Sequence, residues 1–115
     1  MSKEGSDVLQ GTLDMLVLKA LQLEPMHGWG ITERIEQWSE SVLQLGQGTL
    51  YPALYRLEAN GWVAASWEKS EKGKRARYYR ITPKGRKQLA SEQSKWDSFA
   101  RAMGLLLKPT DQEGR

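Results

Sequence analysis

Apolar residues recur every three or four positions over residues 8–23, and this spacing predicts an α-helix with an apolar face. A second face of the same helix adds the apolar side chains of Val8, Met15 and Leu18. A helix that is apolar on two sides needs cover on two sides, from the core of its own chain or from a partner chain. The first face carries Leu9, Leu13, Leu16, Val17, Ala20 and Leu21.

A short second helix is expected after a break that is rich in proline and glycine. Its apolar residues Ile31, Ile35 and Trp38 are spaced at i, i+4 and i+7, as they would be on one helical face. Residues 39–46 then predict a turn that contains a brief extended piece at 42–45.

A third helix is expected to begin near Gly48 or Thr49 and to end at the Asn-Gly pair of residues 60–61, because both residue types tolerate a positive φ. Pro52 would lie in its first turn, where a missing backbone N–H costs little. The buried stripe of this helix is expected to consist of Leu50, Leu54 and Leu57.

Two strands are predicted at residues 62–68 and 76–82, which are rich in aromatic and β-branched side chains. The seven residues between them include a glycine and four cations, so they predict a hairpin with a basic tip. The Thr-Pro pair at 82–83 is typical of a helix start and predicts a last helix that reaches about residue 107. Core or sheet packing is expected for Trp29, Trp38, Trp62 and Trp67.

This order of elements is typical of a winged helix-turn-helix protein, a mainly α fold with a small β-hairpin. The third helix would be the recognition helix, which enters the DNA major groove, and the hairpin would be the wing. We expect residues 1–82 to form this domain and residues 83–108 to form a C-terminal dimerisation helix in the same compact unit. Residues 109–115 would be a tail.

Composition restricts the chemistry that this chain of 115 residues can perform. It has no cysteine, which excludes disulfides and thiolate sites, and a single histidine, which argues against a Ser-His-Asp triad or a multi-histidine metal site. That residue, His27, is expected to hydrogen-bond at a turn or helix end. We therefore expect no enzyme activity, no cofactor and no metal. No stretch is apolar enough for a membrane span or a signal peptide, so we expect a soluble cytoplasmic protein.

The charge distribution indicates a polyanionic partner. Residues 69–87 contain nine cations and one acid, a charge of +8, whereas the chain as a whole carries +3 and its remainder therefore −5. A concentrated positive field favours nucleic acid over a merely solvated loop. Double-stranded DNA is the expected partner, with the wing cations Lys72, Lys74, Arg75 and Arg77 on phosphate or in a narrow minor groove.

The recognition helix supplies the expected base and backbone contacts. Once its buried leucines are set aside, the outward side chains of this region are expected to include Gln47, Thr49, Tyr51, Tyr55 and Arg56. Glutamine and threonine bond base edges, while tyrosine offers a ring to thymine methyls and a hydroxyl to phosphate.

The last helix carries an apolar seam of alternating three- and four-residue spacing, typical of a coiled-coil-like dimer interface. Its members are Leu89, Trp96, Phe99, Met103 and Leu106, with Glu92 as the one polar position. Two facing Trp96 indoles, with Met15 and Leu18 from the partner's first helix, could hold a planar aromatic effector. The alternative is that Trp96 only fills the interface.

Three segments carry a family resemblance: MHGWGI, GTLYPALYRLEANGWV and RYYRITPKG. They resemble the PadR family of bacterial transcriptional regulators, in its compact branch with a single short C-terminal helix. The resemblance implies a homodimeric winged-helix repressor that binds a palindromic operator, with Tyr51 against DNA. It also implies dimerisation through the last helix against the first, and aromatic ligands at the dimer interface in some members.

This sequence departs from the family pattern at one point. Many members carry a tyrosine and an acid after the His-Gly pair, where this chain has Trp29 and Gly30. An inherited hydroxyl-to-phosphate contact is therefore absent, although the Trp29 indole keeps an N–H donor. The alternatives to a DNA-binding regulator are a winged-helix module for protein–protein interaction and a dimer that binds only small molecules.

Overall fold

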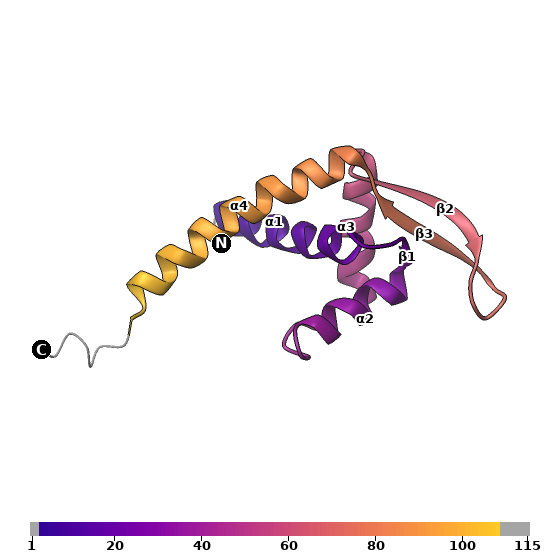
Figure 1. The fold of residues 1–115 in the computed structure, drawn as a ribbon, viewed down its shortest axis with the longest axis horizontal. Helices are drawn as coiled ribbons and strands as arrows, with labels where there is room; N and C mark the ends of the chain where they lie inside the picture. The colour runs from indigo at the N-terminus through magenta and orange to yellow at the C-terminus, as the bar shows by residue number, and fades with distance from the viewer. Residues whose placement is uncertain (1–2, 109–115) are drawn as a thin grey trace, which may run out of the picture.

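The computed structural model describes residues 3–108, with side chains from residue 11 onward. The expected tail at 109–115 lies outside the described residues. Four helices and three short strands confirm the predicted mainly α fold with a small β-hairpin (Figure 1). In chain order the elements are α1 (Lys3–Ala20), β1 (Met26–His27), α2 (Gly28–Trp38), α3 (Gln47–Ala59), β2 (Val63–Lys69), β3 (Arg75–Ile81) and α4 (Pro83–Leu106).

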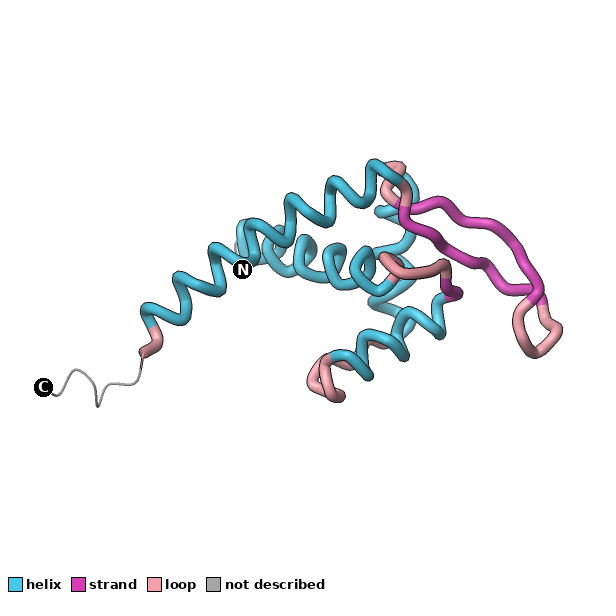
Figure 2. The backbone as a smooth tube through the Cα atoms, in the orientation of Figure 1, coloured by secondary structure: helices cyan, strands magenta, loops and turns pink. Residues whose placement is uncertain are grey.

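The helices form a cluster from which two elements project in opposite directions. The β2–β3 hairpin extends from one end, and the second half of α4 extends from the other (Figure 2). The amino-terminal half of α4 lies along α1, and α1 also contacts α2 and α3. This arrangement places the hairpin and the free part of α4 far apart on a molecule 63 Å long.

The sheet has the order β1-β3-β2 and is antiparallel throughout. The prediction of a short extended piece at 42–45 is wrong, and the third strand is Met26–His27, before α2 rather than after it. The unpaired edge of β3 explains this, because Met26 and His27 can pair there with Tyr79 and Tyr78. Residues 42–45 pair with none of the described strands.

The core gathers side chains from every helix and from the sheet. Val17 and Leu18 of α1, and Leu21 directly after it, are fully or almost fully buried in a cluster with residues of α2, α3 and the strands. The expectation that Leu18 faces a partner chain is therefore wrong: its cover comes from its own chain. Leu89 of α4, expected in the dimer seam, is likewise only 2% exposed and belongs to the core of the monomer.

The recognition helix α3 begins at Gln47, slightly earlier than expected, after the N-cap residue Gly46. Pro52 consequently lies inside the helix and not in its first turn. Gly61, with φ +76°, ends the chain reversal after the helix, as predicted for the Asn-Gly pair. The predicted stripe is confirmed, since three leucines are at most 1% exposed: Leu50, Leu54 and Leu57.

The start of α4 is fixed by local signals and by close packing. The Thr82 hydroxyl accepts a hydrogen bond from the Gly85 N–H at 3.0 Å, which confirms the predicted N-cap. Gly85 is buried directly against the Trp62 carbonyl, where a side chain would collide. The first turn of α4 therefore packs directly against Trp62, the residue before β2.

Candidate nucleic-acid interface

The face of α3 opposite its leucine stripe is open to solvent. Tyr51 and Tyr55, one turn apart, are 43% and 76% exposed, and Gln47 and Thr49 are exposed at the start of the helix. The structure thus places four of the five expected α3 contacts on an accessible surface. Tyrosines on such a surface offer both ring and hydroxyl to a partner.

Tyr51 is held in place by the start of α2. Its hydroxyl lies so close to Gly28 that a Cβ there would collide with it. Immediately before Gly28, His27 caps the helix, because its Nδ1 accepts a hydrogen bond from the Gly30 N–H at 3.1 Å. The His27 ring also meets Tyr78 of β3 edge-on, with centroids 5.3 Å apart. The expected role of His27 at a helix end is confirmed.

Arg56 does not face outward as expected. Its Nη2 donates to Asp14 Oδ1 of α1 at 2.7 Å, and the Arg56 side chain is only 31% exposed. Arg56 adjoins Leu57 at the edge of the buried stripe, and α1 brings a buried carboxylate to that edge. Burial raises the pKa of Asp14, while the hydrogen bond and positive charge of Arg56 act to lower it. Arg56 therefore ties α3 to α1.

The wing tip carries exposed cations, as predicted. Its turn is closed by a hydrogen bond from the Ser70 N–H to the Lys74 carbonyl at 2.6 Å, with Gly73 at φ +80°. Lys72, Lys74 and Arg75 are all exposed at or beside this turn. They lie in the turn that joins β2 to β3, or directly after it, at the end of the hairpin that projects in Figure 1.

Arg77, the fourth expected wing contact, has an acidic partner. Its Nη2 lies 2.9 Å from Glu58 Oε2 on α3, and both side chains are about one-third exposed. The ion pair connects the base of the wing to the end of the recognition helix. Sequence reasoning did not find Glu58, which lies 19 positions before Arg77.

Three of the four tryptophans expected in the core or on the sheet are largely exposed. Trp29 is 63% exposed, Trp38 51% and Trp67 56%. Trp29 and Trp67 both line a hollow of about 560 Å³ between the wing and the helices, together with Tyr51. Trp29 thus stands on the same side of the molecule as the exposed face of α3.

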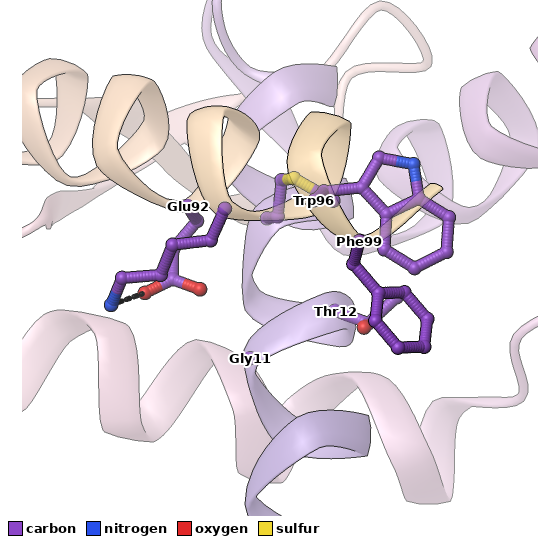
Figure 3. Close-up of a pocket in the computed structure, with 7 residues that line it drawn as sticks. Gly11, Thr12, Glu92, Trp96 and Phe99 are labelled. Carbon is purple, nitrogen blue, oxygen red and sulfur yellow. Dashed lines mark ion pairs between the residues drawn. The ribbon is translucent and has the colours of Figure 1, made fainter. Parts of the chain in front are cut away.

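The far half of α4 presents the rest of the expected seam to solvent: Trp96, Phe99, Met103 and Leu106 are 36% to 78% exposed. Between α4 and α1 lies a cleft of about 350 Å³, lined by Met15, Trp96 and Phe99 and by the polar residue Glu92 (Figure 3). The Trp96 and Phe99 rings are 5.7 Å apart. Of the expected effector residues, Met15 and Trp96 line this cleft, while the buried Leu18 does not.

In the described part of the chain, no helix is both long and apolar enough to cross a membrane.

Known proteins resemble the chain in sequence. A transcriptional regulator of Mycobacterium tuberculosis is 36% identical over 76 residues, which are 66% of this chain and 67% of the relative.

Solved structures share the whole fold. A transcriptional regulator from Clostridium thermocellum superposes with a TM-score of 0.79 at 29% identity, over 89% of this chain and 99% of that one. A PadR family transcriptional regulator from Eggerthella lenta gives a TM-score of 0.70 at 33% identity, over 93% and 90% of the two chains. The sequence profile of the transcriptional regulator PadR-like family matches residues 17–91. The chain therefore belongs to the PadR-like family, and it is a DNA-binding regulator of transcription rather than an enzyme.

Proposed function

We propose that this regulator is a repressor that binds a palindromic operator as a homodimer in the cytoplasm. The observation that carries the proposal is the exposed face of α3, where Tyr51 and Tyr55 stand beside a cationic wing. Helix-turn-helix proteins insert the start of this helix into the major groove. Gln47, Thr49 and Tyr51 would then contact bases and backbone, while Lys72, Lys74 and Arg75 contact phosphate or enter a narrow minor groove beside them.

Dimerisation is proposed through the free half of α4. Trp96, Phe99 and Met103 leave a row of apolar surface uncovered within the chain, and a second copy would bury it. Two recognition helices would then meet half-sites roughly 34 Å apart, one turn of DNA. Leu89 has no part in this interface, because the core of the monomer already buries it.

An effector site is proposed in the cleft between α1 and α4. Met15, Trp96 and Phe99 offer an adaptable thioether and two rings, which suit a planar aromatic molecule. Such a ligand would release DNA only if it bound one arrangement of the dimer better than the other. The alternative is that a second copy closes the cleft and Trp96 serves packing alone.

Selection of duplexes from a random library and from genomic DNA tests the function. We expect the protein to enrich a palindromic site, and Tyr51→Ala to weaken binding to that site by about tenfold to a hundredfold, the value of one good base contact. Binding of Tyr51→Ala to random duplex should change much less. Trp38→Ala, which removes an exposed ring at the far end of α2, is the matched control and should bind normally. Enrichment of no sequence would favour a protein–protein module instead.

A further inference from the structure

One face of the β2–β3 wing is buried at its base and becomes exposed and charged toward its tip. In the register of β2 and β3, Val63 pairs with Ile81, Ala65 with Tyr79, and Trp67 with Arg77. Side chains of directly paired residues lie on one face of a sheet, so all of these share the face that begins in the core. Val63 and Ile81 are buried, whereas Trp67 is 56% exposed.

Trp67 lies under two guanidinium groups. The Arg75 Cζ is 5.4 Å from the centroid of the Trp67 ring, and the Arg77 Cζ is 5.8 Å from it. Both distances are in the range where a cation is attracted to the face of an aromatic ring. One exposed indole therefore attracts both cations.

The two arginines differ in their other partners. Arg77 is paired with Glu58 of α3 at 2.9 Å, so its charge is partly compensated and its side chain braces the wing against the helix. Arg75 has no ion pair among the residues that the structure describes. Of the two guanidiniums on the ring, Arg75 is the one whose charge stays available for DNA.

We propose that Trp67 is a positioning residue for DNA binding: its ring holds the Arg75 guanidinium in an extended, oriented state, ready to enter a narrow minor groove beside the site read by α3. This inference rests on the proposed function. It assigns the DNA contact to Arg75 and a bracing role to Arg77. It requires arginine at position 75, because a lysine ammonium lacks the planar face that stacks on an indole.

A double-mutant cycle tests this role on the duplex that the wild type selects and on a random duplex. Trp67→Ala should weaken binding to the selected duplex roughly two- to fivefold, the value of an exposed cation–π contact. Trp67→Phe, which keeps a ring, should rescue most of that loss. In the Arg75→Ala background, Trp67→Ala should weaken binding little further, because Trp67 is proposed to act on DNA binding only through Arg75. Equal losses in both backgrounds would overturn the proposal, as would an unchanged affinity of Trp67→Ala.

A second measurement separates this proposal from the proposed function, because it needs no DNA. In the free protein, the Trp67 ring should shift the Arg75 side-chain proton resonances upfield. Trp67→Ala should abolish that shift without lowering the melting temperature of the fold by more than a few degrees. Specific duplex binding without the shift would contradict the positioning role. A shift in a protein that selects no duplex would instead contradict the DNA-binding function and the role of Arg75 in it.

Discussion

Arg56 of the recognition helix and Asp14 of α1 form an ion pair with 2.7 Å between Nη2 and Oδ1. The Asp14 side chain is 10% exposed and the Arg56 side chain 31%, so water screens the pair only partly. The Arg56 Nε is buried and has no hydrogen-bond partner among the described residues. The contact from Nη2 to Asp14 is therefore the main polar contact of the Arg56 side chain. The position of α3 relative to α1 thus depends on a charge pair as well as on leucine packing.

Removal of Arg56 should destabilise the fold strongly. Arg56→Ala leaves the Asp14 carboxylate buried without its counter-ion, and we expect the free energy of unfolding to fall by about 3 kcal/mol. Lys95→Ala is the matched control, because it removes the largely exposed partner of Glu92 on α4 and should cost at most about 0.5 kcal/mol. Urea unfolding at one fixed protein concentration measures both. Similar losses for the two variants would show that the Asp14 pair is no stronger than a surface pair.

The same pair predicts a pH dependence whose sign follows from burial. Burial raises the pKa of Asp14 above its ordinary value of 3.8, so the folded protein retains this proton to higher pH than the unfolded chain. Its contribution to stability therefore decreases as the pH rises through the folded-state pKa. Arg56→Ala loses the two effects that lower that pKa, and the pKa should rise further.

We therefore expect the stability deficit of Arg56→Ala to be smallest at acidic pH and to grow toward neutrality. Unfolding of the wild type and the variant, from below the ordinary Asp14 pKa of 3.8 up to neutral pH, measures this difference. In an Asp14→Asn background no group titrates at position 14, so the deficit that Arg56→Ala causes relative to Asp14→Asn alone should be nearly independent of pH. A deficit of Arg56→Ala that stays constant over this range would contradict the assignment to Asp14.

Gly28→Ala should displace Tyr51 on the exposed face of α3, although Gly28 itself lies on α2. The added methyl group would collide with the Tyr51 hydroxyl and ring, so we expect Tyr51 to move and specific DNA binding to weaken about tenfold or more. Gly30→Ala is the control, since a methyl there meets only ordinary contacts with Met26 and His27. Binding to a selected duplex measures both. In a Tyr51→Ala background, Gly28→Ala should cause little additional loss, and a full additional loss would show that Gly28 acts by another route.

Charge on the α4 seam should separate the proposed dimer. Phe99→Glu places a carboxylate within the row of Trp96 and Met103, and we expect sedimentation to give the mass of a monomer at micromolar concentration. Leu105→Glu is the matched control, because Leu105 is exposed on the same helix but is not a member of the seam. A dimer that survives Phe99→Glu, or a wild type that is already monomeric, would contradict dimerisation through this surface.

Features set by neighbouring residues could be predicted from the sequence. Thr82 caps α4, Gly61 reverses the chain after α3, and the leucine stripe of α3 is buried, and each depends on signals only a few positions apart. The alternation of the hairpin strands likewise predicts which side chains lie together on the wing. The positions of the three leucines on α3 also predict most of its exposed face.

Features that depend on distant partners could not be predicted in this way. The spacing that placed Leu18 on a second face is correct as geometry, but it does not show that the same chain covers that face. Leu89 fits the α4 seam by spacing and yet packs in the core, because its part of α4 joins the buried cluster while the later seam residues stay exposed. Arg56 meets an acid 42 positions away, and no local pattern contains that information.

The two residues of β1 have a consequence for the energetics of binding. A hairpin alone is only marginally stable in water, but β1 joins the base of the wing to the start of α2 through Tyr78 and Tyr79. The conformational entropy of the wing base is therefore lost when the chain folds and not when it meets DNA, so it does not subtract from affinity. Glu58 of α3 holds the next residue, Arg77, so only the part of the hairpin beyond Arg77, toward the tip, remains to adapt its shape to a particular duplex.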